Sequence, residues 1–492
     1  MHYQSPRGLE QFIGGAWGTR DVCQGPVGLL VASGEHEALR AVLLRTFAAQ
    51  QANGDWPQWF DYLPGHDATA PDSHGDVVYW PLLALGEYLE MTGDASVLTE
   101  PVAWADSPAT SSLREHVQAA LAHTRRHRLF DGRLPAYGHG DWNDSMQPAS
   151  PALAAELCST WTAVLETQAL VTLARGLRAW DAAWASTLMA QSEATREALL
   201  DVALVGGELA GYARQVGTNP ELLVHPTDEL TGLHHGLLQQ IHAISAEVLA
   251  AADAEHHRVL IEEHLNGPTG AYLFDHPVAY HGGPVELFRR AEAATFWGRE
   301  IGLMYTHSHL RWVEALCVLG RGDDAWRELL KAIPIGLADR VPSARRRQTT
   351  CYYSSSDARF TDRYHAERDA EALFSGAVGF EGGWRVYSSG PGIMLRLVAE
   401  RFLGVRVRAD HVELDPVLPS GWGEVTASVP LPRGEVKLRL LPNDSPPRLG
   451  DTPLEAIESH NSYRRAGWNV PREAIERAAA SGSEVLLGHR VR

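Results

Sequence analysis

Residues 131–152, DGRLPAYGHGDWNDSMQPASPA, are rich in Gly, Pro and Asp and separate two segments whose apolar residues recur at helical spacing. The segment before them, residues 112–127, opens with Ser112 and Glu115 at the spacing of a capping box, which marks a helix start. The segment after them, residues 159–178, has the same helical periodicity. Long loops inside a compact domain usually carry function. The stretch therefore predicts two helices joined by a functional loop.

The same alternation of helix and long loop extends over most of the chain. Asp76 is the expected N-cap of a helix that ends at Gly93, and residues 53–75 and 266–298 read as further long loops. No motif recurs at the fixed period that an α-solenoid requires. Paired helices joined by long polar loops therefore favour a mainly α fold, an α/α toroid. The further helices are expected at residues 35–51, 77–91, 182–204, 234–250, 253–265, 308–319 and 323–333.

The pattern changes near residue 405, where short alternating or β-branched runs lie between Pro and Gly. We expect strands at residues 405–412, 425–429 and 434–441, and one terminal helix at 472–480. The predicted domains are accordingly residues 1–404 as an α/α barrel, 405–445 as a small C-terminal β element, and 446–492 as a tail.

Composition narrows the class of protein. The chain has 492 residues and a net charge of −18, which argues against nucleic acid or an anionic membrane as a partner. No apolar run is long enough to span a bilayer, and the first residues lack the apolar core of a signal peptide. The four cysteines form no CxxC pair, which favours reduced thiols in a cytoplasmic protein. No histidine pattern predicts a metal, and no glycine-rich loop predicts a nucleotide cofactor.

Two carboxylates, Asp141 and Asp144, flank Trp142 and an amide within the long loop. Cleavage of a glycosidic bond needs a proton for the leaving oxygen, and a carboxylic acid beside an aromatic ring can supply it. A ring such as Trp142 can also stack on a sugar. The spacing alone leaves a turn or an oxygen cluster open as the alternative, with Asp141 holding the loop through backbone N–H groups.

The loop sequence GDWND at residues 140–144 closely resembles the signature of glycoside hydrolase family 94, which includes cellobiose, chitobiose and 1,2-β-oligoglucan phosphorylases. Residues 7–11, 351–357 and 387–392 look closest to the 1,2-β-oligoglucan branch. The resemblance covers about residues 7–440 and implies an (α/α)6 toroid. The other matching segments are TRDVCQ (19–24), REIGLMYTH (299–307), LGRGDDAW (319–326), GWRVYSSGPG (383–392) and LDPVLP (414–419).

The resemblance also implies a role for each matching residue. Asp144 corresponds to the general acid, and Trp142, with Asp141 beside it, to the sugar site next to the scissile bond. Arg20 and Asp21 correspond to the pair that binds the same glucose. The expected phosphate ligands are His307, Ser388 and Ser389, and the additional expected sugar contacts are Arg299, Glu292 and Glu381, with a structural role left open for the two glutamates.

The reaction implied is inverting phosphorolysis of a β-linked glucooligosaccharide, β-1,2-linked in this branch, to α-glucose 1-phosphate. Phosphate is already an anion, so the carboxylate base of an inverting hydrolase is replaced by cationic and hydroxyl donors. Phosphate and oligosaccharide are then substrates, and no cofactor is expected. One alternative is an inverting β-glucan hydrolase with Glu292, Glu300 or Asp357 as its base. The other is a non-catalytic carbohydrate-binding subunit.

Members of the family carry an N-terminal β-sandwich domain before the barrel. In this sequence the early Arg-Asp pair already stands at residue 20, so we expect that domain to be absent from the chain. Contacts made by that region would then come from elsewhere. A homodimer or a separate N-terminal partner domain is the expectation that follows.

Overall fold

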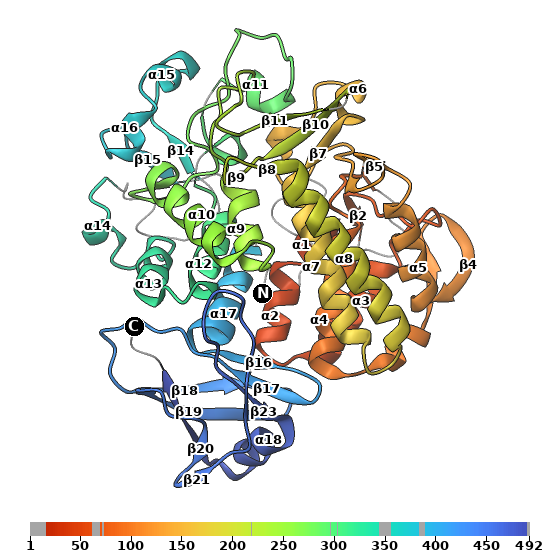
Figure 1. Cartoon of the computed structure of the whole chain (residues 1–492), viewed down its shortest axis with the longest axis vertical. Helices are drawn as coiled ribbons and strands as arrows, with labels where there is room; N and C mark the ends of the chain where they lie inside the picture. Colours follow the sequence, from red (N-terminus) through yellow and green to blue (C-terminus); the bar gives the residue numbers. More distant parts are fainter. Residues whose placement is uncertain are drawn as a thin grey trace.

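A computed structural model describes residues 16–61, 69–70, 73–217, 219–295, 297–302, 304–343, 356–382 and 389–489 (Figure 1). Within this part the chain is rich in helices and carries several small sheets. The longer predicted helices are present within a few residues of their expected bounds. The capping box at Ser112 is also present, because Ser112 Oγ accepts a bond from the amide of Glu115 and the Glu115 carboxylate accepts one from the amide of Ser112.

Six helices follow one another through their contacts. Each packs on the next along the chain, and the last of them, α17, packs back on α2; Figure 1 shows these two helices side by side near the middle of the view. Gly392 of α17 makes this seam possible, since a Cβ there would lie 2.1 Å from the carbonyl oxygen of Gly25. The six helices are α2 (Gly25–Ala32), α4 (Tyr79–Thr92), α7 (Thr160–Leu177), α9 (Leu237–Ser245), α12 (Thr306–Val318) and α17 (Ser389–Leu397).

A second set of helices packs on members of the first. The set comprises α3 (His36–Phe47), which contacts α2 and α4, with α8 (Ala182–Ala203) on α7, α10 (Ala251–His264) on α9 and α13 (Gly322–Lys331) on α12. Helix α5 (Leu113–Thr124) packs instead on β4 (Ser107–Ser112), which pairs with β3 (Pro101–Trp104). The short helices are α1 (Thr19–Val22), η2 (Ala95–Thr99), η3 (Asp144–Met146), α6 (Pro151–Ala154), α11 (Arg289–Ala293), η4 (Arg299–Ile301), α14 (Leu337–Arg340), α15 (Arg363–Arg368), α16 (Glu371–Phe374) and η5 (Val398–Phe402).

The loops between helices form short sheets that periodicity did not predict. The largest of these orders β11 (Asn219–Leu223), β10 (Tyr212–Val216) and β7 (Leu157–Ser159). The others pair β1 (Ala16–Gly18) with β2 (Trp59–Asp61), β5 (Arg128–Leu129) with β6 (Leu134–Pro135), β8 (Leu204–Val205) with β9 (Glu208–Leu209), β12 (Asn266–Gly267) with β13 (Gly270–Ala271), and β14 (Ser356–Ala358) with β15 (Phe380–Gly382).

The last part of the chain forms two sheets and a helix beside α17, drawn in blue at the bottom of Figure 1. The predicted helix at 472–480 is present as α18 (Arg472–Ser481). The predicted division at residue 445 has no counterpart in these sheets, because β23 pairs with β17 and β24 pairs in parallel with β19. One sheet orders β16 (Val405–Val407), β17 (His411–Leu414), β23 (Trp468–Pro471) and β22 (Ile457–Glu458), and the other β18 (Val425–Pro430), β19 (Glu435–Pro442), β24 (Glu484–His489), β20 (Arg448–Leu449) and β21 (Thr452–Pro453).

The expectations for the cysteines and for membrane-spanning helices can also be compared with the structure. Cys23, Cys158 and Cys317 are buried with free thiols, and Cys351 lies outside the described residues. Among the helices described, none combines the length and the apolar character that a transmembrane segment needs.

Candidate active site

Several loops converge on η3, the short helix that carries Asp144. His74 pairs with Gly138 in a β-bridge, and the amide of Gly75 donates to the carbonyl oxygen of Tyr137. On the other side of η3, the amide of Ala149 donates to the carbonyl oxygen of Leu287 at 2.8 Å, and Pro148 bridges to Phe288. The predicted loops 53–75, 131–152 and 266–298 therefore meet at the predicted acid.

Arg20 of α1 joins these loops to the body of the protein. Its Nη2 donates to Oδ1 of Asp144 at 3.1 Å, while its Nη1 donates to the backbone carbonyl of Asp141 and to Oδ1 of Asp76 at 3.3 Å. Arg20 is only 6% exposed. Burial alone would lower its pKa, but the charges of Asp76 and Asp144 outweigh that effect and raise the pKa above its ordinary value. The guanidinium is therefore a permanent buried cation beside the predicted acid.

Asp76 was expected to cap the helix that begins after it, and this expectation is wrong. Helix α4 has Val78 at its N-cap position and no side-chain cap there. Asp76 instead accepts a bond of 2.9 Å from Nε1 of Trp80 and pairs with Arg20. A buried cation needs a buried anion nearby, and that requirement takes precedence over capping here.

Asp141 shapes the loop from within. It is 1% exposed, its Oδ1 accepts from the amide of Asn143 at 2.7 Å, and its Oδ2 accepts from the hydroxyl of Ser159 at 2.7 Å. Ser159 is the N-cap of α7, so this bond ties the loop to a long helix. Burial raises the pKa of Asp141 to about 7. These contacts match the loop-holding role considered for Asp141.

Asp144 is the more accessible of the two carboxylates, with a side chain 32% exposed beside the nearly buried Arg20. Nδ1 of His74 lies 3.8 Å from the same oxygen that Arg20 contacts, and 2.9 Å from the carbonyl oxygen of Asp141. Burial and the charge of Arg20 lower the pKa of His74. Arg20 thus holds one oxygen of Asp144, and part of the Asp144 side chain remains exposed.

His307 reaches the same place from α12, where it occupies the first turn. Its ring centroid lies 5.0 Å from that of Trp142 in an edge-on arrangement, and the ring of Tyr305 also packs edge-on against Trp142 at 5.1 Å. Burial holds the pKa of His307 well below its usual range, and the nearby charges of Arg311 and Arg20 lower it further. The structure therefore brings together Arg20, Trp142, Asp144 and a neutral His307.

Behind His307 lies a group of charged and polar side chains that the sequence reading missed. Arg311 donates to Glu314 at 2.7 Å, and Arg401 donates to the other oxygen of Glu314 at 3.0 Å. Nε2 of His242 lies 2.6 Å from the amide oxygen of Gln168. Arg311 and Arg401 share the one carboxylate of Glu314, and the charge of Arg311 adds to burial in lowering the pKa of His307. The spacing of Arg311 and Glu314, three residues apart in a helix, was the one available signal.

Asp21 is adjacent to Arg20 and turns back toward Gly18. A Cβ at position 18 would lie 2.2 Å from Oδ2 of Asp21, so the glycine provides the space that this carboxylate occupies. Burial raises the pKa of Asp21, an effect that Arg20 opposes and Asp144 reinforces. The predicted Arg-Asp pair therefore lies within electrostatic range of Asp144.

The remaining predicted residues divide into two groups. Glu292 is 3% exposed, and its carboxylate accepts bonds from the amides of Glu286, Leu287 and Phe288 at 2.6–2.9 Å, so its oxygens hold a loop. Glu300, one of the bases considered for a hydrolase, lies 3.5 Å from Nη1 of Arg290. Ser388 lies outside the described residues, and so do the side chains of Arg299, Asp357, Glu381 and Ser389.

Metal binding has no candidate in this region. Across the residues described, no group of three or more His, Cys, Asp or Glu side chains is arranged to hold an ion. The chemistry that the arrangement permits is proton donation from Asp144, contact with a sugar at Trp142, and anion binding near Arg20 and His307.

Comparison with known proteins shows a family match over most of the chain. The family model of the glycosyl hydrolase 94 superfamily catalytic domain matches residues 18–380. The 1,2-beta-oligoglucan phosphorylase of Listeria innocua is 35% identical over 483 residues, 96% of this chain and 44% of that protein. Two more distant relatives are the cyclic beta-(1,2)-glucan synthase NdvB of Rhizobium meliloti, 26% identical over 84% of this chain and 14% of that protein, and the 3-O-beta-D-glucopyranosyl-beta-D-glucuronide phosphorylase of Paenibacillus borealis, 23% identical over 78% and 47%.

The chain spans less than half the length of each of these curated relatives. The family match covers the segment from before Arg20 to beyond His307, and with it Trp142 and Asp144. The chain therefore belongs to the glycosyl hydrolase 94 superfamily and contains its catalytic domain.

Proposed function

We propose that the chain is the catalytic part of an inverting glycoside phosphorylase that cleaves β-1,2-linked glucooligosaccharides with inorganic phosphate. The products are α-glucose 1-phosphate and the shortened oligosaccharide. The observation that carries this proposal is that Arg20 pairs with Asp144 while His307 packs against Trp142 of the same loop, which brings a proton donor together with two nitrogen groups suited to an anion. The identity to the Listeria innocua phosphorylase supports the choice of substrate.

In the proposed reaction, a phosphate oxygen attacks the anomeric carbon of the terminal glucose while the bond from that carbon to the glycosidic oxygen breaks. Asp144 gives its proton to the departing oxygen, which leaves as a hydroxyl of the shortened chain. A single displacement inverts the anomeric configuration from β to α. The proton of hydrogen phosphate is released to solvent as the new C–O bond forms, and Asp144 regains a proton from solvent. One C–O bond therefore replaces another and the number of protons is unchanged.

Phosphate would meet one permanent cation and one neutral hydrogen-bond donor at this site. Arg20 is permanently charged, and neutral His307 can donate one hydrogen bond to a phosphate oxygen. The predicted ligands Ser388 and Ser389 belong to this proposal as further hydroxyl donors.

The six helices that contact one another in succession support an (α/α)6 toroid as the scaffold of the site. In this arrangement the loops at one end of the ring form the sugar cleft. Arg20 and Asp21 hold the glucose whose bond is broken, Trp142 stacks on it, and Asp141 keeps the loop in shape. Arg299 would contact the substrate from the segment before α12.

The direct test is incubation of the purified chain with β-1,2-glucooligosaccharides, with and without inorganic phosphate, followed by assay of glucose 1-phosphate. We expect product only with phosphate, and its loss in Asp144→Asn. Asp131→Asn is the matched control, because Asp131 lies exposed on the same loop away from the site. Sugar release without phosphate would favour a hydrolase, and a folded chain that turns over neither way would contradict the proposal.

A further inference from the structure

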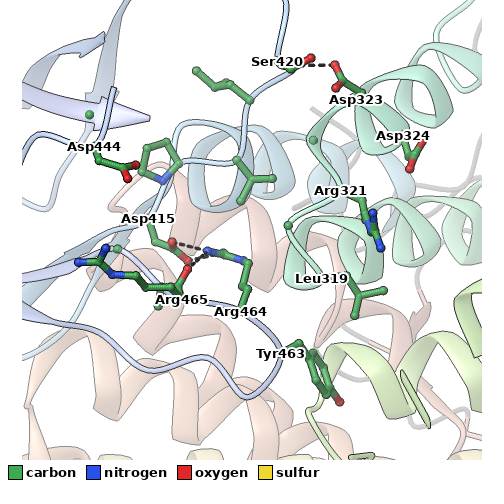
Figure 2. Close-up of a pocket in the computed structure, with 18 of the residues that line it drawn as sticks. Leu319, Arg321, Asp323, Asp324, Asp415, Ser420, Asp444, Tyr463, Arg464 and Arg465 are labelled. Atoms are coloured by element: carbon green, nitrogen blue, oxygen red, sulfur yellow. Dashed lines mark hydrogen bonds and ion pairs between the residues drawn. The ribbon is translucent and has the colours of Figure 1, made fainter. Parts of the chain in front are cut away.

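A cavity of about 470 Å³ lies between the helices and the C-terminal sheets (Figure 2). Its walls are the turn from Leu319 into α13, the turn after β17 that contains Asp415, and the segment around Arg464 that leads into β23. None of the residues gathered around Asp144 lines it. Its volume falls in the range of small-molecule sites, about 300–1,000 Å³.

The floor of the cavity is rigid. Arg464 donates two parallel bonds to the carboxylate of Asp415, at 2.9 and 2.6 Å, and a third to the backbone carbonyl of Val318 at 3.2 Å. The side chains of Arg464 and Asp415 are 8% and 4% exposed. A buried forked pair of this kind keeps its polar atoms in fixed positions before any ligand arrives.

The charges of the lining exclude an anion as the natural ligand. Each guanidinium that lines the cavity already has a carboxylate partner: Arg464 has Asp415, Arg321 has Glu255 at 2.8 Å, and Arg465 has Glu458. The lining carries five carboxylates against these three arginines. Phosphate or an acidic peptide would therefore meet net negative charge.

The groups at the rim suit a ligand with hydroxyl groups and no charge. The side chains of Arg321 and Asp324 are 46% and 29% exposed, so both can bind ligand while they keep their ion-pair partners. Trp468 and Leu319 add apolar surface to the same lining. Vicinal hydroxyls match arginine donors and carboxylate acceptors, and the C–H faces of a sugar ring match aromatic and aliphatic surface.

We infer that this cavity is a second, non-catalytic site for a neutral oligosaccharide. The chemical class follows from the lining. That the saccharide is the β-glucan which the chain is proposed to cleave rests on the proposed function. A chain held here at one end would raise the local concentration of its other glucosyl units near the molecule.

The test is hydrogen–deuterium exchange of the whole chain with β-1,2-glucooligosaccharides and without phosphate, so that no turnover occurs. We expect slower exchange in residues 318–324, 414–420 and 463–468, separately from any protection of the loop around Asp144. The double variant Arg321→Ala, Asp324→Ala should weaken binding at the cavity about tenfold or more and leave the loop around Asp144 as protected as before. Arg477→Ala, at an arginine on α18 that is 74% exposed and does not line the cavity, should change neither.

The inference would be overturned if saturating oligosaccharide failed to slow exchange in the cavity segments. It would also be overturned if Arg477→Ala weakened binding at the cavity as much as the double variant does. Inorganic phosphate alone should leave these segments unchanged, and protection by phosphate would overturn the assignment of a neutral ligand. The two proposals fail separately: absence of phosphorolysis with the cavity still protected counts against the catalytic proposal alone. Phosphorolysis without protection of the cavity counts against this inference alone.

Discussion

Nη2 of Arg20 lies 3.1 Å from Oδ1 of Asp144, although 124 positions separate the two residues in the sequence. The other terminal nitrogen of the same guanidinium bonds the backbone of Asp141 and the carboxylate of Asp76. One side chain therefore fixes both the predicted acid and the loop that carries it. The planar fork of arginine permits these contacts at once, and a single ammonium cannot reproduce them.

Arg20→Lys should retain the buried positive charge and lose the forked hydrogen-bonding geometry of the guanidinium. We expect kcat/KM for phosphorolysis to fall about 100-fold or more, because a small displacement of a catalytic group has effects of that size. Circular dichroism and thermal unfolding should stay close to those of the unsubstituted protein. Arg133→Lys, at an exposed arginine paired with Asp201, is the matched control and should keep full activity. An Arg20→Lys protein with unchanged kcat/KM would show that the fork is dispensable.

The pKa of Asp141 predicts how stability depends on pH. Burial raises it from 3.8 to about 7, so between these values the folded protein holds a proton that the unfolded chain has released. The free energy of unfolding should therefore fall as pH rises from about 4 to about 7, by at most about 1.4 kcal/mol per unit from this group. Asp141→Asn should lack this component of the slope.

Urea unfolding at several pH values measures the difference between the two proteins. The exposed Asp131→Asn on the same loop should keep the slope of the unsubstituted protein. If Asp141→Asn also shows the slope of the unsubstituted protein, Asp141 is ionised in the folded state throughout this pH range.

Arg311 should control the charge of His307. Both lie on α12, one turn apart, and the positive charge of Arg311 lowers the pKa of His307. Arg311→Met should therefore raise that pKa and move the acidic limb of the pH profile of KM for phosphate to higher pH. Glu314 would still be paired with Arg401 in this variant. Arg311→Lys keeps the charge and should leave the limb in place; equal profiles for the two variants would refute the electrostatic link.

Gly18→Ala should disturb sugar binding more than folding. The backbone at Gly18, with φ −65° and ψ 120°, suits alanine, but the new Cβ would lie 2.2 Å from Oδ2 of Asp21 and displace that carboxylate. We expect KM for the oligosaccharide to rise about tenfold, with little change in melting temperature. Gly421→Ala, where a Cβ meets nothing within 4 Å, should alter neither quantity. A large loss of stability in Gly18→Ala without a change in KM would contradict the role given to Asp21.

Two helices of the succession do not show a helical signal in the sequence. Neither α2 nor α17 was predicted, because each contains glycine and proline, residues that ordinarily interrupt helices. The seam between them needs those glycines, since a Cβ on Gly392 would overlap the backbone of Gly25. Long helices with good caps, such as those beginning after Ser112 and Ser159, were predictable because their signals are local.

The candidate site was predictable in part for the same reason. Asp144, Trp142 and Arg20 stand in short distinctive segments that resemble those of a known family, and the structure brings them together with His307. His74 and Asp76 come into contact with these residues only when the chain folds. No motif in the sequence around them marks them as site residues. Glu292 lies on α11, which packs against η3, but its oxygens bind backbone amides.

The contact between α2 and α17 also determines when, during synthesis, this surface of α2 becomes covered. Arg20 precedes α2 and is among the first described residues to be synthesised, whereas α17 emerges from the ribosome after every other helix of the succession. The α2 face of this contact therefore has no α17 beside it until residues 389–397 have been synthesised. Closing so long a loop is slow compared with forming the local helix pairs, and a nascent chain is accordingly exposed at this face until α17 arrives.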